Sequence, residues 1–170
     1  AAGIANAAPI TPSYTTFGTL AGATFGGSGI PNTAVSIFTS AGGDLTLGLT
    51  AHQRLVGPNL ANDGAGTFSA ETGISGGAPS PADPYALWNF AFYIAGSGVS
   101  DLSFALFYDF DAAVANEEST HGKIAFPGSA IAASLPAQNS WNLGMNFLAT
   151  SGSGITAPAG AFDPNAAGEY

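Results

Sequence analysis

The hydrophobic residues of this chain recur at every second position, and this period constrains the fold more than any other feature. In residues 102–110 one row of alternate positions carries only large apolar or aromatic side chains, namely Leu102, Phe104, Leu106, Tyr108 and Phe110. Successive side chains of a β-strand point to opposite faces of a sheet, so this row shares one face. The pattern predicts a sheet that buries one face.

Seven further segments are predicted to be strands. Residues 140–148 alternate in the same way, and residues 45–50 alternate three leucines with threonine and glycine. Residues 87–94 carry aromatic side chains on both faces, which is typical of a strand that is covered on both sides or joins another subunit. Weaker patterns predict strands at residues 13–19, 34–39, 66–71 and 122–126.

Glycine and proline separate these segments. The chain contains 24 Gly and 11 Pro, gathered in clusters such as residues 73–84, so long helices are not expected. One helical turn is expected within residues 112–118. Seven to nine short strands with long Gly/Pro-rich loops predict an all-β, antiparallel β-sandwich of jelly-roll or immunoglobulin-like type. The sequence alone does not separate a sandwich from a barrel. We expect one domain over residues 13–170, after an N-terminal lead or signal-peptide remnant at residues 1–12.

The charge balance excludes several classes of partner. Arg54 and Lys123 are the only permanently positive side chains, against eleven carboxylates, and the formal net charge is −9. Phosphate binding needs clustered cations, so no nucleic acid is expected as a partner, nor is an anionic membrane surface. No run of about 18 apolar residues is present, so no direct membrane span is expected. Cysteine is absent, which excludes disulfides and thiolate chemistry.

Carboxylates are concentrated in residues 108–121. Oxygen donors are what Ca²⁺ prefers, so calcium is the one cofactor that the sequence suggests. The alternative is a solvated acidic loop in which an Asp caps a helical turn. The candidate calcium ligands are Asp109, Asp111, Asn116, Glu117 and Glu118.

Aromatic side chains form the second candidate site. Such rings either stack on sugars or on another subunit, or they pack in the core. The candidate binding or assembly residues are Trp88, Phe90, Phe92, Tyr93, Trp141 and Tyr170.

No catalytic motif is present. His52 and His121 are the only imidazoles, and their spacing does not support a local metal site. The pattern Gly-x-Ser-x-Gly is absent. A glycosidase pair among Glu71, Glu117 and Glu118 stays open, because the separation of two carboxylates is not visible in a sequence. We predict that the protein is not an enzyme.

Six segments together resemble bacterial secreted proteins that carry a C-terminal Pro-Glu-Pro (PEP-CTERM) sorting signal. They are residues 10–18, 23–32, 88–90, 107–111, 140–145 and 162–170. The resemblance implies export, a β-rich fold and a location at the cell surface or in the extracellular matrix, and it implies no catalytic residues. In such proteins a further strand and the sorting tail follow the last segment, whereas this sequence stops at Tyr170. Residues 5–7, Ala-Asn-Ala, fit the end of a secretory signal.

These observations predict a structural protein of the cell surface or extracellular matrix that self-associates. It would form a homo-oligomer, or a filament by β-strand addition at an open sheet edge. The alternative is an extracellular module that binds a glycan, with polysaccharide as its partner, or calcium.

Overall fold

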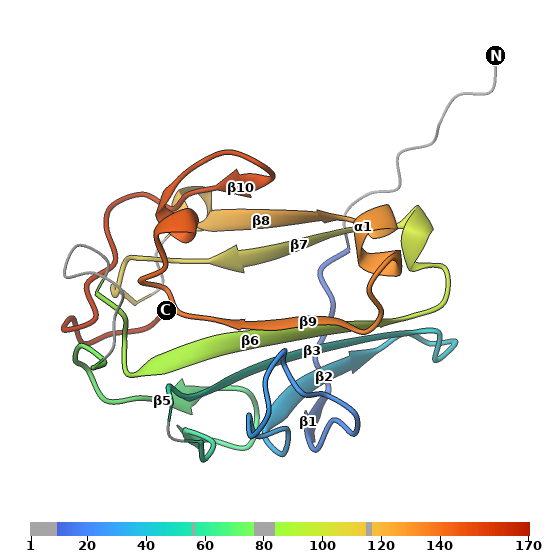
Figure 1. Cartoon of the computed structure of the whole chain (residues 1–170), viewed down its shortest axis with the longest axis horizontal. Helices are drawn as coiled ribbons and strands as arrows, with labels where there is room; N and C mark the ends of the chain where they lie inside the picture. The colour runs from blue at the N-terminus through green and yellow to red at the C-terminus, as the bar shows by residue number, and fades with distance from the viewer. Residues whose placement is uncertain (1–9, 56, 77–83, 115–116) are drawn as a thin grey trace.

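A computed structural model describes residues 10–55, 57–76, 84–114 and 117–170 of the chain (Figure 1). Their regular secondary structure is mostly β-strand, and the strands pair in antiparallel sheets that do not close into a barrel. The prediction of an all-β, antiparallel fold is confirmed. The described part contains one α-helix, of only five residues, so it holds no helix able to cross a membrane.

The larger sheet has five strands. Their order is β1 (Thr16–Gly18), β2 (Val35–Thr39), β3 (Leu45–Gln53), β6 (Trp88–Gly96) and β9 (Ala137–Trp141). β3 is its central strand and pairs with β6 along nine residues, from Leu45 opposite Gly96 to Gln53 opposite Trp88.

Two smaller sheets complete the strand set. One has the order β10 (Ile155–Thr156), β8 (Gly122–Pro127) and β7 (Ser103–Tyr108). The other is a short hairpin of β4 (Ala61–Asn62) and β5 (Phe68–Ser69). Figure 1 shows β7 and β8 running above β6 and β9.

The core lies where the three-stranded sheet faces the large sheet. Phe92 and Ile94 of β6 are each 6% exposed, and Phe104 and Leu106 of β7 pack against their cluster. The ring centroid of Phe92 lies 5.3 Å from that of Phe126 on β8. Side chains from both sheets therefore bury each other, as the alternation in residues 102–110 predicts.

The opposite face of β6 is covered as well. Ala91 and Tyr93 belong to a second cluster that contains the fully buried Phe25 and Val35. The other residues of this cluster come from the chain before β2 and from β2 itself. The stretch of β6 from Ala91 to Ile94 is therefore covered on both faces, which accounts for the aromatic residues on both faces there.

Short helical turns carry the chain between the sheets at one end. η1 (Val99–Asp101) follows β6, and α1 (Gly128–Ala132) precedes β9. Gly128 donates its N–H to the carbonyl of Leu102 at 2.9 Å, and a Cβ at this position would overlap the carbonyl oxygens of Val99 and Leu102. Only glycine permits this close approach, which closes one end of the core.

Two predicted elements differ in the structure. The strand predicted at residues 140–148 ends at Trp141, and η3 (Asn146–Ala149) follows after a turn. The reason is Asn142, whose fully buried amide donates to the main-chain oxygens of Ala86 at 3.0 Å and Trp88 at 2.7 Å and turns the chain away from the sheet. The second is the helical turn expected within residues 112–118: its described part holds only the first residue of a 3₁₀ turn, η2 (Glu118–Thr120), and residues 115 and 116 lie outside the described residues.

Candidate functional site: an aromatic cleft beside the large sheet

The start of β6 lies at an open part of the sheet. Two cavities of about 430 and 520 Å³ adjoin each other here, because they share part of their lining. We call the two cavities together the aromatic cleft. The residues that line both are Ala51, Gly66, Phe68, Trp88, Phe90 and Tyr170.

The floor of the aromatic cleft is the inner face of β3 and β6. Trp88 and Phe90 share a face with the buried Phe92, but both are only half-buried. Opposite Phe90 in the β3–β6 register stands Ala51, which also lines the cleft. A side chain this small leaves the neighbouring aromatic rings uncovered.

One wall comes from the β4–β5 hairpin. Phe68 lines both cavities, and its ring centroid lies 6.0 Å from that of Phe17 on β1. The hairpin turn is held by Asp63, whose Oδ1 accepts the N–H groups of Ala65 at 2.8 Å and Thr67 at 3.0 Å. These backbone hydrogen bonds lower the pKa of Asp63. The carboxylate therefore fixes the hairpin that presents Phe68.

The opposite wall is the segment from Pro164 to Tyr170. Glu169 donates its N–H to the carbonyl of Ala112 at 3.1 Å, and Gly73 donates to the carbonyl of Pro164 at 2.7 Å. A Cβ at Gly168 would overlap the carbonyl oxygen of Ala112, so glycine permits this close contact. The segment is thereby attached to two separate loops, and Figure 1 shows the C-terminus and β5 near the beginning of β6.

Tyr170 closes this wall. Its ring centroid lies 6.0 Å from that of Trp88 and 5.4 Å from that of Phe162, and its hydroxyl donates to the carbonyl of Asp163 at 3.1 Å. Burial, followed by the nearby carboxylates of Asp163, Asp109 and Asp111, raises the pKa of Tyr170. The phenol stays neutral, and its ring is positioned beside Trp88.

Tyr108 of β7 lines the inner side of the aromatic cleft. Its hydroxyl donates to the main-chain oxygen of Leu148 at 2.6 Å, and burial raises its pKa to about 12. This hydroxyl has a structural partner and holds its proton at neutral pH. Tyr14 also lines the cleft, and burial raises its pKa too.

The lining carries negative charge only. Asp109 borders one cavity, Glu71 and Glu169 border the other, and neither Lys nor Arg is among the lining residues. Arg54 lies instead over the ring of Tyr85, with its guanidinium carbon 4.6 Å from the ring centroid. The cleft therefore combines aromatic surfaces with an acidic rim.

The structure separates the six aromatic candidates into two groups. Trp88, Phe90 and Tyr170 meet in the aromatic cleft, where Trp88 and Phe90 also pack against a buried cluster that contains Leu148. Phe92 and Trp141 instead pack in the core, and Tyr93 packs on the outer face. The aromatic cleft residues that the sequence analysis missed are Tyr14, Phe68, Phe107, Tyr108 and Phe162. No local pattern distinguishes them, because their roles depend on where the loops cross the sheet.

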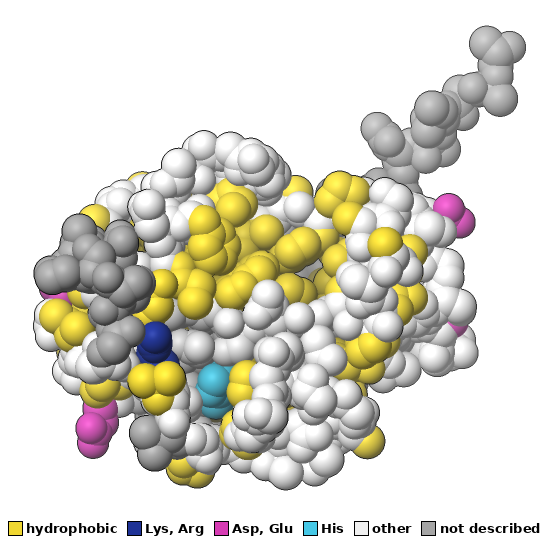
Figure 2. Space-filling view, viewed as in Figure 1, with side chains coloured by type: hydrophobic (Ala, Val, Ile, Leu, Met, Phe, Trp, Pro, Cys, Tyr) yellow, Lys and Arg dark blue, Asp and Glu magenta, His cyan; other side chains and the backbone are white. Residues whose placement is uncertain are grey.

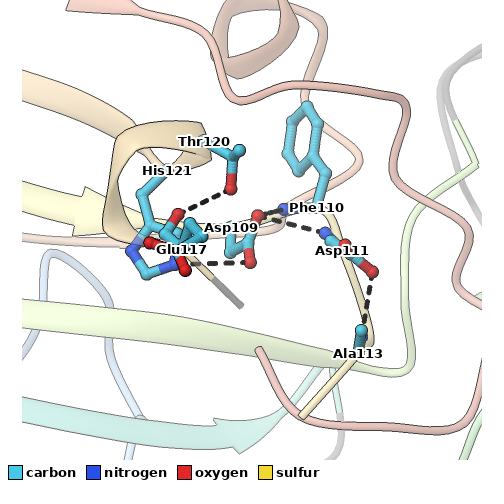
Figure 3. A network of polar contacts seen from close by, with 7 residues as sticks. All are labelled: Asp109, Phe110, Asp111, Ala113, Glu117, Thr120 and His121. Atoms are coloured by element: carbon cyan, nitrogen blue, oxygen red, sulfur yellow. Dashed lines mark hydrogen bonds and ion pairs between the residues drawn. The ribbon is translucent and has the colours of Figure 1, made fainter. Parts of the chain in front are cut away.

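The acidic loop after β7 holds itself together through its carboxylates (Figure 3). Asp109 Oδ1 accepts the N–H groups of Phe110 at 2.7 Å and Asp111 at 3.1 Å, and its Oδ2 lies 3.6 Å from His121 Nε2. Asp111 Oδ1 accepts the N–H of Ala113 at 2.9 Å. Both carboxylates thus accept backbone N–H groups of their own loop, and Asp109 is buried rather than solvated.

The other calcium candidates do not join them in a described cluster. Glu117 and Glu118 are exposed, and Asn116 lies outside the described residues. Within the described ranges, no group of three or more His, Asp or Glu side chains could hold a metal ion. Calcium binding stays a prediction.

A second polar group joins β3, β6 and β9. His52 contacts the carbonyl of Gln53 through Nδ1 at 2.9 Å and Ser140 Oγ through Nε2 at 2.8 Å, and Asn89 donates to the same Oγ at 3.0 Å. Burial lowers the pKa of His52, so the ring is neutral at neutral pH. Ser140 and His52 line neither cavity of the cleft. We interpret the group as a buried connection between strands.

Comparison of this chain with protein-family models, with curated proteins and with solved structures finds no match. The residues of the aromatic cleft therefore carry the functional argument by themselves.

Proposed function

We propose that this protein is a non-enzymatic glycan-binding module and that the aromatic cleft is its binding site. We further propose that its fold is a β-sandwich of jelly-roll or immunoglobulin-like type. The observation that carries the functional proposal is the meeting of Trp88, Phe68 and Tyr170, from three separate parts of the chain, around one open cleft.

Aromatic rings suit sugars for a physical reason. The C–H face of a pyranose ring is apolar and packs on a flat aromatic surface, while its hydroxyls need polar partners at the rim. Trp88 and Phe90 supply half-buried rings, and Glu71 and Glu169 supply acceptors at the edge. The mixture of apolar floor and polar rim is what a sugar ring requires.

The shape favours an oligosaccharide over a single sugar. Each cavity falls in the range of small-molecule sites, roughly 300–1,000 Å³, and the two adjoin. An extended chain of several sugars would occupy both. We propose an extracellular or cell-surface location, which the resemblance to secreted proteins supports and where polysaccharides are available.

Isothermal titration with neutral hexasaccharides of glucose, xylose, mannose and N-acetylglucosamine tests the proposal. At least one should bind, and Trp88→Ala and Tyr170→Ala should each weaken that binding about tenfold or more, about 1.4 kcal/mol. Phe147→Ala is the matched control, because Phe147 is an aromatic residue on η3 that is 39% exposed and lies outside the cleft. Tyr170 is 41% exposed, so its variant tests the site even where loss of Trp88 disturbs folding. Absence of binding to all of these neutral sugars and to their trimethylammonium derivatives would refute the proposal.

A second candidate function is self-association into an oligomer or filament by β-strand addition. β9 lies at one edge of the large sheet and is paired only with β6. At the end of β9, the ring centroid of Trp141 lies 5.4 Å from that of Phe147 and 6.3 Å from that of Phe126. Figure 2 shows hydrophobic side chains gathered where β8 faces β9. An open edge next to an apolar surface favours addition of a strand from a second copy.

Sedimentation velocity and electron microscopy over a wide range of protein concentration test this candidate. Self-association should grow with concentration and disappear in Phe147→Asp, which places a charge in the half-exposed ring cluster. Ala125→Asp on β8 gives an exposed charge away from that cluster as a control. A strict monomer at high concentration would rule out this function.

A further inference from the structure

We infer that the aromatic cleft ranks glycans by charge: chains that carry ammonium groups bind best, neutral chains bind less tightly, and chains that carry carboxylates or sulfates are rejected. This inference rests on the proposed function and names the class of glycan that the site selects.

The first observation is the sign of the charges around the cleft. Glu71 and Glu169 are exposed and line the same cavity as Trp88 and Phe68. Asp109 borders the adjoining cavity but is buried and lies close to His121, so it contributes less to the ligand than the two glutamates. The accessible rim charge therefore comes mainly from Glu71 and Glu169.

The second observation is the location of the two basic residues. Arg54 is placed over Tyr85, and Lys123 is an exposed residue of β8 that pairs with β10 and β7. Neither lines the cleft, and the chain contains no other Lys or Arg. An anionic sugar in the cleft would lose water without gaining a cationic partner.

The aromatic rings of the cleft also favour a positively charged ligand. The face of an aromatic ring attracts a cation, most strongly for Trp, and an ammonium group held near Trp88 would also face the rim carboxylates. At Tyr170, burial and then the negative charges of Asp163, Asp109 and Asp111 raise the pKa of the hydroxyl, which agrees with a negative field at this wall. Complementary charge of this kind chooses between ligands of the same shape.

The experiment compares three forms of one sugar backbone. The neutral hexasaccharide that binds most tightly in the titration above is compared with its trimethylammonium derivative and its uronate form; a glucose backbone is used where no neutral chain binds. The trimethylammonium group keeps its charge at every pH, so titration of the ligand does not enter. Titrations at pH 7 are run at low salt and at about 0.5 M salt, where exposed charges are largely screened.

The ammonium form should bind about two- to fivefold more tightly than the neutral form at low salt, the range expected for one or two exposed charge contacts. The uronate form should show no measurable binding. Added salt should reduce the preference for the ammonium form and leave the affinity of the neutral form unchanged.

Substitutions at the rim test whether Glu71 and Glu169 cause the preference for the ammonium form. Glu71→Gln and Glu169→Gln should each reduce the affinity for the ammonium form about twofold or more relative to the affinity for the neutral form. Asp101→Asn is the matched control, since Asp101 is an exposed carboxylate on η1 that does not line the cleft. It changes the net charge equally and should leave the ranking intact.

The outcomes separate this inference from the proposed function. If the neutral form binds and the ammonium form is no tighter, or the uronate form binds equally well, the charge ranking is wrong and the glycan site stands. If the ammonium form alone binds, the ranking holds. If none of the three forms binds, the glycan site and the ranking are both wrong.

Discussion

The two ends of β6 have the same alternating pattern of residues but lie in different environments. Phe92 and Ile94 are buried against the three-stranded sheet, whereas Trp88 and Phe90, on the same face, border an open cleft. The two tryptophans of the chain follow this division. Trp141 packs against four aromatic rings, while Trp88 has Tyr170 as its ring neighbour and lines both cavities. Whether one face of a strand becomes core or binding site therefore depends on the layer packed opposite it, not on the sequence of the strand itself.

The largest effect on stability should come from the end of β6 that is buried against the three-stranded sheet. Phe92→Ala removes a core ring and should lower the free energy of unfolding by about 3–5 kcal/mol, because the surrounding sheets cannot fill the cavity. Phe68→Ala, at the cleft wall, should cost less than half as much, since its ring is only half-buried. Urea denaturation of both variants measures the contrast. Equal losses would mean that the cleft wall belongs to the core.

The polar anchor beneath Trp88 should have the next largest effect. Asn142→Ala leaves main-chain groups of Ala86 and Trp88 without their side-chain partner in a buried place, which should cost about 2 kcal/mol or more. Asn139→Ala, an exposed position on β9, should cost under about 0.5 kcal/mol. Thermal denaturation distinguishes them, and similar melting temperatures would contradict the role of Asn142.

At the cleft end of β6, a larger side chain should fill the cleft without disturbing the buried end of the strand. Ala51→Leu should cover the ring of Phe90 and weaken glycan binding about tenfold, about 1.4 kcal/mol, while the unfolding free energy stays within about 1 kcal/mol of the original. Ala125→Leu, on the exposed side of β8, should change neither quantity. Titration and denaturation of the two variants provide the test, and unaltered binding in Ala51→Leu would place the glycan elsewhere.

The smallest effect should be a pH dependence from His52, which lies in neither of these regions. Burial lowers the pKa of His52 below its ordinary value of 6.5, so the unfolded chain binds a proton more readily than the folded chain. Its contribution to stability is complete above pH 6.5 and declines as the pH falls through that value. The difference in unfolding free energy between the original protein and His52→Gln should shrink from pH 7.5 to pH 5. A constant difference would contradict the shift.

Local patterns predicted the strands better than the site. The alternation in residues 102–110 marked β7 and the face it buries, because both depend on the period of a strand. The same alternation at residues 140–148 was misleading, since the buried amide of Asn142 overrides it. Trp88 and Trp141 have equivalent local patterns, so only the positions of the β4–β5 hairpin and the C-terminal segment decide which one lines a cleft. Those positions depend on contacts between distant residues, such as Glu169 with Ala112.

The two indole N–H resonances of this protein report directly on whether a glycan binds in the aromatic cleft. Because the chain contains only two tryptophans, a proton–nitrogen correlation spectrum shows one indole signal for Trp88 and one for Trp141, and Trp141→Phe assigns them. Titration with the best-binding hexasaccharide should shift the Trp88 signal progressively and leave the Trp141 signal in place. A shift of Trp141 alone, or of neither signal while the sugar binds, would show that the aromatic cleft is not the binding site.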